Sequence, residues 1–464
     1  MSSKYMIHTR HVPNRFKPVT RSGIIAWEEG CLKCAECVKK QCIYGVYDHR
    51  ELDVRQMIDS IDNQCKSCYR CVQSCPKELI QKSLNPEFLA MGDPHWTPDI
   101  ITRLWYQAET GKIPVSGAGY PGPFIGPGFD SMWTDMSEIV RPTRDGIHGR
   151  EYISTAVDLG RSPGNLVFTE TGDMETDEPD LVDIPLPIIL RVPTFGSLNI
   201  KTLKGWGMAA RRLGTFLALP LSRIEGDLLD LSSHLIPVAG SETKIDRSIE
   251  GVRIIEILWD KNWENVIREV RKYYPSALLS IRLPMIQGVE ENIIPLLDSG
   301  FSIINLDGSF HGRSRDNESC FVKDGIRDLH MNLVEKSIRD QITLISGGGF
   351  AMAEQVAKGL ICGADAICVD FPILIALECR MCRRCEQGLP CPVDIEQCSS
   401  KWVASRTVNL ISAWHGQILE VMGAMGIRDA RRLRGEVGRA IFYDDLDHAL
   451  FGSLNNMEEG YEIE

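Results

Sequence analysis

The sequence predicts an α/β protein in which a (β/α)8 TIM barrel follows a small cysteine-rich α+β unit and precedes a helical segment. Two observations predict the barrel: eight apolar, strand-like runs lie between residues 185 and 378, and helical patterns separate several of them. Dense cysteine motifs mark the N-terminal unit. After Cys398, apolar residues recur at helical spacing and indicate the C-terminal segment.

Each barrel strand is predicted from a short apolar run. The helical patterns between the runs include Trp263–Tyr273, Glu290–Leu297 and Ala351–Leu360. The eight predicted strands are Leu186–Val192, Thr215–Leu219, Leu235–Val238, Arg253–Ile257, Ala277–Leu283, Ser302–Leu306, Ile342–Ser346 and Ala366–Val369. A doubly wound open sheet is the competing fold, because it also alternates strands with helices.

Composition argues against several classes of function. The chain has 464 residues, 43% of them hydrophobic, so it can bury a large core. Its net charge of −12 argues against nucleic-acid binding, which needs a basic surface. No stretch approaches the roughly 20 uncharged apolar residues that span a bilayer. No apolar core follows the basic residues near the N-terminus, so no signal peptide is evident. We therefore expect a cytoplasmic protein without a membrane span.

Changes in composition divide the chain into four parts. Residues 1–90 hold an extended arm and the cysteine-rich unit. Residues 91–184 are rich in Gly and Pro, and we expect irregular chain packed on the barrel there. The barrel and a second cysteine-rich stretch occupy 185–398, and the helical segment occupies 399–464.

Eight cysteines near the N-terminus form two similar motifs. They read Cys31-x-x-Cys34-x-x-Cys37-x4-Cys42 and Cys65-x-x-Cys68-x-x-Cys71-x3-Cys75-Pro76. This spacing is typical of bacterial ferredoxins with two [4Fe-4S] clusters, in which the fourth cysteine of each motif binds the other cluster. The predicted ligand sets are therefore Cys31, Cys34, Cys37 and Cys75 for one cluster, and Cys65, Cys68, Cys71 and Cys42 for its partner. Structural zinc and disulfides are the alternatives.

A third cysteine group follows the last predicted strand. It consists of Cys379, Cys382, Cys385 and Cys391, and Cys398 lies beyond it. Four ligands suit a [4Fe-4S] cluster and three suit a [3Fe-4S] cluster, with zinc as the alternative. We interpret Cys398 as a buried cysteine or as a thiol beside the ligands.

The seventh predicted strand runs directly into Gly347, Gly348 and Gly349, and a helical pattern follows. Glycine lets the backbone approach an anion closely, and a helix N-terminus presents free N–H groups. Barrels commonly bind phosphate at the loops after strands 7 and 8. This loop therefore predicts the phosphate site of a flavin whose ring lies over the barrel mouth, with a plain tight turn as the alternative.

Other predicted flavin contacts lie at the ends of other strands. Arg282, at the C-terminal end of the fifth strand, could stabilise negative charge on a reduced flavin or pair with a carboxylate at the rim. Small residues after the first strand would allow close approach to the ring, or form a simple turn. These small residues are Thr194, Gly196 and Ser197. Asp370 and Phe371, which follow the eighth strand, are further predicted flavin contacts.

These residues resemble the FMN-binding synthase domain of glutamate synthase over about residues 92–398. The runs Ser346–Phe350, Cys362–Asp365, Leu374–Leu377 and Cys379–Pro392 are similar to that family's phosphate loop, last strand and cluster loop, in the same order. Asp307 and Gly308 resemble its sixth-strand loop, and Arg282 stands where the family has a flavin-contacting lysine. With the N-terminal ferredoxin-type unit, the chain resembles short archaeal-type glutamate-synthase-like proteins, which implies FMN as cofactor. The loops after the second, fourth and sixth strands depart from the family.

The resulting hypothesis is an iron–sulfur flavoprotein oxidoreductase that passes electrons between its clusters and FMN. Its expected partners are redox proteins, ferredoxin or other electron-transfer subunits, in a hetero-oligomeric complex. One alternative is a glutamate or N-methylglutamate synthase-type enzyme that reduces a 2-imino acid, with His311, Arg313 and Arg315 as candidate carboxylate ligands. Another alternative is a non-enzymatic subunit that transfers electrons to a larger redox partner.

Overall fold

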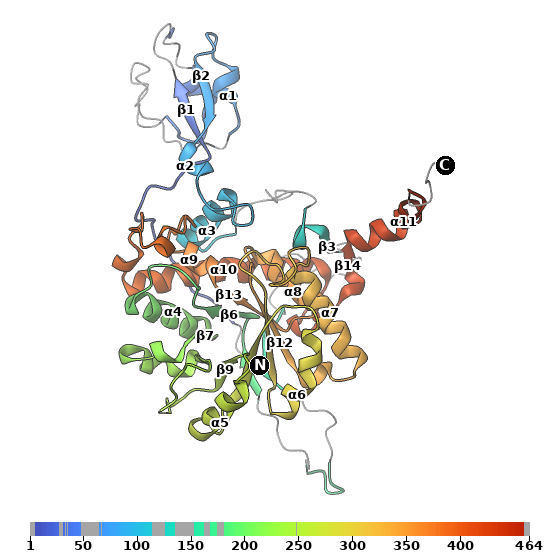
Figure 1. Cartoon of the computed structure of the whole chain (residues 1–464). Coiled ribbons are helices and arrows are strands. Elements are labelled where there is room, and N and C mark those ends of the chain that lie inside the picture. Colours follow the sequence, from blue (N-terminus) through green and yellow to red (C-terminus); the bar gives the residue numbers. More distant parts are fainter. Residues whose placement is uncertain are drawn as a thin grey trace.

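Eight parallel strands form a closed barrel, which confirms the predicted fold and rules out the open sheet (Figure 1). The computed structural model describes residues 5–26, 31–32, 34, 36–47, 65, 67–113, 126–134, 153–161, 168–173, 181–246 and 248–458. The barrel strands are β6 (Ile188–Arg191), β7 (Leu217–Pro220), β8 (Leu235–Ala239), β9 (Ile254–Leu258), β10 (Leu278–Pro284), β11 (Ile303–Asp307), β12 (Thr343–Gly347) and β13 (Ala366–Val369). Closure comes from the parallel pairing of β13 with β6.

Helices cover the outside of the barrel (Figure 1). They are α4 (Ile200–Leu213), α5 (Trp263–Tyr273), α6 (Ile293–Asp298), α7 (Val322–Glu335), α8 (Ala353–Cys362) and α9 (Phe371–Ile375). The span of α5 is the one predicted. A 3-10 helix over Gly226–His234 follows β7 in place of an α-helix. In the described part of the link between β8 and β9 there is no α-helix, so the barrel departs from a regular alternation there.

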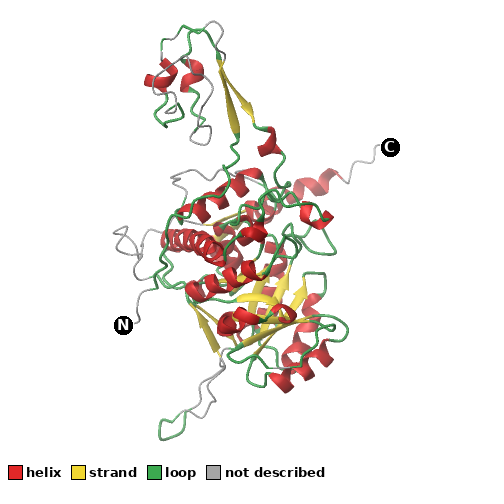
Figure 2. Cartoon of the chain, turned by 90° about the vertical axis from the view of Figure 1, so that its left-hand side faces the viewer, coloured by secondary structure: helices red, strands yellow, loops and turns green. Residues whose placement is uncertain are grey.

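The N-terminal unit contains a two-stranded antiparallel sheet. Strand β1 (Ser22–Ala26) pairs with β2 (Ile80–Leu84), with Ser22 opposite Leu84. Two short helical turns accompany the sheet, a π-helical turn over Glu36–Gln41 and α1 (Arg70–Gln73). Figures 1 and 2 show this unit projecting from the barrel, to which it is joined through α2 (Pro86–Leu89).

The stretch predicted to be irregular contains a regular helix, α3 (Pro98–Thr110). The prediction was wrong here because the Gly/Pro-dense run begins only after this helix, and that run lies largely outside the described residues. Thr97 caps α3 by accepting a hydrogen bond from the Ile100 amide. Short strand pairs follow, formed by β3 (Met132–Thr134) with β14 (Ala440–Phe442), and by β4 (Val157–Gly160) with β5 (Leu181–Ile184).

The C-terminal segment is helical, as predicted. It begins with α10 (Ser400–Met425), which is largely buried against α3, α4 and α8, and ends with α11 (Tyr443–Glu458), which points away from the barrel (Figure 1). Burial on several sides explains why α10 is apolar around much of its circumference. Within the described residues, no helix combines the length and apolar character needed to cross a membrane.

Thr343 joins the barrel to the β4–β5 pair. Its buried hydroxyl accepts a hydrogen bond from the Gly160 amide at 2.9 Å and donates one to the Gly160 carbonyl at 2.7 Å. We expect Thr343→Val to leave both backbone groups unsatisfied and to cost about 1–3 kcal/mol, whereas Thr343→Ser retains the hydroxyl. Melting temperatures of the two variants measured side by side test this, and equal values would contradict it.

Candidate functional site

The eight N-terminal cysteines line two separate pockets, and each pocket takes cysteines from both motifs. The first set is Cys31, Cys34, Cys37 and Cys75. The second set is Cys42, Cys65, Cys68 and Cys71. The structure therefore brings together the two predicted groups, with the fourth cysteine of each motif crossing to the other group.

Polar groups surround these thiols. The Leu79 amide donates to the Cys75 sulfur at 3.3 Å, and the Lys82 ammonium donates to the Cys65 sulfur at 3.1 Å. Such donors stabilise charge on sulfur. Among the described residues, no three His, Cys, Asp or Glu side chains come close enough to share one metal ion. The four thiols of each group thus line a space rather than converge on a point.

The third cysteine group lies on one loop, residues 378–398, which we call the third cysteine loop. Burial, together with the neighbouring thiols of Cys382, Cys391 and Cys385, raises the pKa of the Cys379 thiol to about 12, although the Met381 amide acts to lower it. This mutual influence places the four predicted ligands together. Cys382 is exposed, whereas the other three are partly buried. The Met381 amide donates to the Cys379 sulfur at 3.4 Å.

The third cysteine loop is anchored by buried charge. Glu378 is 3% exposed and accepts hydrogen bonds from the backbone amide of Arg15, at 2.6 Å, and from its guanidinium, at 3.0 Å. Arg406, on α10, is fully buried and donates to the carbonyl oxygens of Ala376, Val12 and Trp105. The N-terminal arm, α3 and α10 therefore fix where the loop begins. Cys398 is buried, as predicted, with its pKa raised to about 11 by burial.

A cation occupies the centre of the barrel mouth. Arg191, at the end of β6, forms ion pairs with Asp307 at the end of β11 and with Asp370 after β13, the latter at 2.6 Å. Arg315 reaches Asp307 from outside at 2.6 Å. Burial alone would raise the pKa of Asp307, but Arg191, Arg282 and Arg315 outweigh it and lower the pKa. Asp307 and Asp370, which we predicted as flavin contacts, are thus partners of Arg191.

A second charged group lies deeper in the barrel. Arg282 pairs with Glu256 of β9, and the Asn305 amide donates to the other Glu256 oxygen at 2.6 Å. Pairing with a carboxylate was the alternative interpretation of Arg282, and the structure shows that pairing. The sequence signal that we missed was the charged residues Arg191 and Glu256 inside otherwise apolar strands.

The three glycines let two rim loops pack together. A Cβ on Gly348 would lie 2.6 Å from the Gly308 carbonyl group, and one on Gly349 would lie 2.2 Å from the Gly312 nitrogen. Both residues also have positive φ angles, of 96° and 71°. Gly347 lies against the Arg191 guanidinium. The glycine loop, residues 347–352, is therefore fitted to the loop after β11, and Gly308 belongs to that contact.

Aromatic side chains fill the rim between the first strand and the third cysteine loop. Phe195, in the predicted Thr194–Ser197 stretch, lies 4.8 Å from Phe371 between ring centroids, and Phe371 lies 4.7 Å from Phe310. Trp96 joins this cluster and donates its indole N–H to the Phe310 carbonyl. The Arg383 guanidinium lies over both Phe195 and Phe310. Thr194 is exposed beside the cluster, and Gly196 and Ser197 are partly buried.

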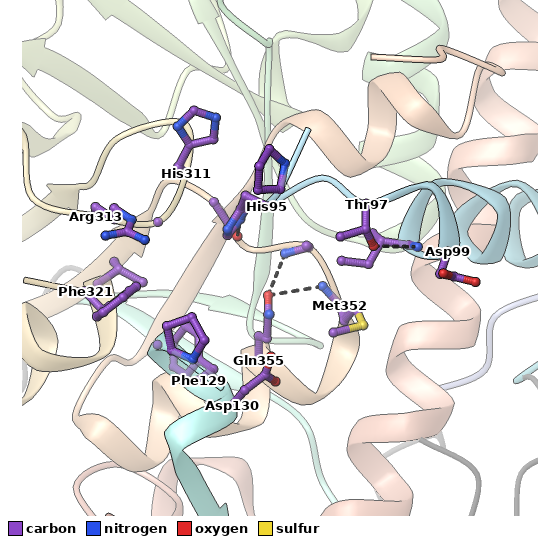
Figure 3. Close-up of a pocket in the computed structure, with 18 of the residues that line it drawn as sticks. His95, Thr97, Asp99, Phe129, Asp130, His311, Arg313, Phe321, Met352 and Gln355 are labelled. Carbon is purple, nitrogen blue, oxygen red and sulfur yellow. Dashed lines mark hydrogen bonds between the residues drawn. The ribbon is translucent and has the colours of Figure 1, made fainter. Parts of the chain in front are cut away.

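A cavity of about 630 Å³ opens between α3, the loop after β11 and the start of α8 (Figure 3). Of the predicted flavin residues, only Gly349 lines it, so the cavity is one loop away from the predicted position. Its cationic residues are Arg103 and Arg313. Arg103 contacts the Met352 sulfur, and Arg313 lies 4.6 Å from the centre of the Phe321 ring. Within the described residues neither has a carboxylate partner at ion-pair distance.

Side chains from four segments shape the cavity, which explains why no single motif predicted it. His95 comes from residues 85–97, which we call the connector because they join β2 to α3. Its Nε2 atom donates to the Gly349 carbonyl at 2.7 Å. Gln355 of α8 accepts from the Ala351 and Met352 amides, as the dashed lines in Figure 3 show. Phe129 contributes an aromatic wall.

The second half of the barrel, the third cysteine loop and α10 match a known protein family. Residues 247–428 match the conserved region in glutamate synthase. The predicted resemblance to the glutamate synthase family is thereby confirmed.

Particular relatives extend the similarity over most of the chain. An archaeal-type glutamate synthase [NADPH] of Dehalococcoides mccartyi is 23% identical, covering 88% of this chain and 92% of the relative. An archaeal glutamate synthase [NADPH] of Archaeoglobus fulgidus is 24% identical, covering 92% and 95%. Among solved structures, a mutant flavocytochrome b2 with benzoylformate gives a TM-score of 0.46 at 12% identity, covering 82% of this chain and 87% of that one.

Removal of Arg191 should destabilise the rim strongly. Arg191→Gln leaves Asp307 and Asp370 without their shared cation, which we expect to cost roughly 3–5 kcal/mol at neutral pH. In the native protein the pKa of Asp307 lies below 3.8, so its contribution is present above the unfolded pKa and lost as pH falls through the folded pKa. In Arg191→Gln the Asp307 carboxylate has lost this cation, so its pKa in the folded variant is higher than in the folded native protein.

The difference in melting temperature between the native protein and Arg191→Gln should therefore narrow as pH is lowered from about 7 to about 3, through the ordinary pKa of an aspartate. Arg191→Lys, which keeps a positive charge, serves as the matched control and should lose less. A difference that stays constant or widens on acidification would contradict the role given to Arg191.

Proposed function

We propose that this protein is an iron–sulfur flavoprotein oxidoreductase of the glutamate synthase type. It carries two [4Fe-4S] clusters in the N-terminal unit, a third cluster on the third cysteine loop, and FMN at the barrel rim. The single observation that carries this proposal is the sorting of eight cysteines into two groups of four with crossed fourth members. A crossed arrangement is typical of two-cluster ferredoxins.

The surroundings of the thiols support clusters over zinc. A zinc ion with bonds of about 2.3 Å to sulfur would draw four thiols onto one point. The thiols here surround pockets instead, with amide and ammonium donors directed at sulfur. Exposed Cys34 and Cys68 lie at the outer surface of the unit, where a redox protein such as ferredoxin or another electron-transfer subunit could approach.

The third cluster occupies a position between the N-terminal unit and the barrel. The Gly92 amide of the connector donates to the Arg380 carbonyl at 3.1 Å, and Arg383 covers the aromatic cluster on the other side. Four thiols give a [4Fe-4S] cluster. A [3Fe-4S] cluster would form if the exposed Cys382 does not bind.

The cavity beside Gly349 is the part of the rim that fits FMN. Its volume is within the usual range of cofactor sites, roughly 300–1,000 Å³. Arg103 and the first turn of α8 offer positive charge to a phosphate, and Phe129 and Phe321 offer apolar faces to a planar ring. When bound, FMN exchanges single electrons with clusters and electron pairs with a substrate. Arg282, Asp307 and Asp370 then shape the rim through their ion pairs.

A glutamate or N-methylglutamate synthase-type activity is the second candidate. The names of the relatives favour it, and so does Arg313, a cation in the cavity that could bind a substrate carboxylate. We further propose that the protein works as a subunit of a larger electron-transfer assembly, organised as the four units 1–90, 91–184, 185–398 and 399–464.

Cysteine variants test the cluster assignment. If the fourth ligands cross, Cys31→Ser and Cys75→Ser damage the same cluster, so each variant and the double variant lose about four irons per chain. The combination of Cys31→Ser with Cys42→Ser loses both clusters. Iron and sulfide analysis with EPR of the reduced protein distinguishes these cases, and zinc in place of iron would end the proposal.

An arginine variant tests the flavin position. Arg103→Gln removes a charged partner of the phosphate and should weaken FMN binding about tenfold to a hundredfold, measured by titrating deflavinated protein with FMN. Riboflavin, which lacks the phosphate, should bind both proteins equally. Arg268→Gln, an exposed arginine on α5, is the matched control. Unchanged FMN affinity in Arg103→Gln would place the flavin elsewhere.

A further inference from the structure

Asp93 and His311 form a hydrogen-bonded pair at the edge of the cavity, although they lie far apart in the sequence. Asp93 of the connector accepts a hydrogen bond at 3.2 Å from the Nε2 atom of His311, which belongs to the loop after β11. The other Asp93 oxygen accepts from the His95 and Trp96 amides, each at 2.8 Å. The carboxylate is therefore fixed in position, and it fixes the orientation of the His311 ring.

We propose that His311, oriented by Asp93, is the proton-transferring residue of the cavity, serving a ligand whose C=N or C=O bond is reduced there. This inference rests on the proposed function, because it requires an electron-pair donor in the cavity. It adds a residue and a proton route that the cysteine groups and the flavin position do not supply.

The geometry assigns opposite roles to the two nitrogen atoms of His311. Nε2 faces Asp93, so Nδ1 is the nitrogen left for a ligand, and His311 is among the residues that line the cavity. The side chain is 45% exposed, so solvent can return a proton after each transfer. A carboxylate that holds an imidazole by one nitrogen stabilises the positive charge of the protonated ring.

The ionisation of Asp93 supports this arrangement. Burial alone would raise the pKa of Asp93, but the Trp96 and His95 amides and the His311 ring outweigh it and lower the pKa. The other charged groups around the pair are Arg313 on the same loop as His311 and Arg383 on the third cysteine loop. Asp93 is thus a carboxylate surrounded by donors and positive charge.

His95 has a different role, although it lines the same cavity (Figure 3). Its Nε2 atom is engaged with the Gly349 carbonyl, and burial lowers its pKa, so the ring is neutral at pH 7. A neutral ring that is already bonded positions the connector against the glycine loop. The proton route therefore belongs to His311 and not to its neighbour, 6.0 Å away between ring centroids.

The atoms and electrons balance as follows. Reduction of a C=N or C=O bond forms a C–H bond from a hydride and an N–H or O–H bond from a proton. A reduced flavin bound in the cavity would supply the hydride and would be oxidised in the step. The proton leaves the protonated His311 ring, which becomes neutral and regains a proton from water. Without a donor at this place, the developing negative charge on nitrogen or oxygen would stay uncompensated.

The test compares His311→Gln and Asp93→Asn with the native holoprotein, and uses exposed His448→Gln as the matched control. Flavin and iron contents are measured first. The reduced proteins are then mixed with 2-oxoglutarate plus ammonium or methylamine, and separately with ferricyanide, which takes electrons without a proton. Flavin reoxidation is followed by absorbance.

We expect His311→Gln to slow reoxidation by the 2-oxo acid and amine at least about a hundredfold, and Asp93→Asn to slow it less. Reoxidation by ferricyanide and the cofactor contents should stay unchanged.

Other results would overturn the inference. Unchanged rates in His311→Gln, an equal loss with ferricyanide, or a native protein that reacts with neither mixture would each remove His311 as the proton donor. A native protein that contains clusters but no flavin would instead fail the proposed function, and the cofactor analysis identifies that case before any kinetics.

Discussion

The rim of this barrel depends on the Arg191 guanidinium. It lies at the centre of the mouth and holds the ends of β6, β11 and β13 through two buried carboxylates, while Gly347 packs against it. A buried cation with two anions is stable only when each partner is present, because a lone buried charge is costly. The rim loops that begin at these strand ends carry Phe195, Phe310 and Phe371. Arg191 therefore positions the aromatic cluster, and through it the wall against which the third cysteine loop lies.

A second buried arginine, Arg406, joins segments at the outer edge of the barrel, and its partners are main-chain carbonyl oxygens in place of carboxylates. Arg406 donates to carbonyl oxygens from the N-terminal arm, α3 and the stretch before Cys379, and burial lowers its pKa to about 10. Glu378, the first residue of the third cysteine loop, is held in place by the hydrogen bonds that it accepts from Arg15. These two anchors, at Ala376 and Glu378, directly precede Cys379, the first thiol of the loop. The N-terminal arm thus belongs structurally to the third cysteine group.

Features of the fold and the site that depend on residues close together in the sequence could be predicted, whereas those that depend on residues far apart in the sequence could not. The crossed cysteine groups were predictable because the motif spacing specifies them locally and the strand pair β1–β2 brings the motifs together. Alternation of apolar runs with helices likewise predicted the barrel. Asp307 was placed correctly at the rim and Arg282 near the C-terminal end of its strand, but their partners come from other strands, and no spacing reveals which charges meet. The cavity was unpredictable for the same reason, since Arg103, Phe129 and His311 belong to separate segments.

Within a few residues, the connector contacts the third cysteine loop, the glycine loop and the loop after β11. Within its length, Gly92 bonds to the third cysteine loop, Asp93 to His311, His95 to the glycine loop and Trp96 to the loop after β11. These contacts join the chain leaving the N-terminal unit to three components of the rim, because His311 and Phe310 both belong to the loop after β11. Because adjacent residues of one extended segment make all four, a displacement of the N-terminal unit that pulled on the connector would reach the third cysteine loop and the cavity together. The segment between β2 and α3 therefore makes the geometry of the third cysteine loop and the geometry of the cavity interdependent.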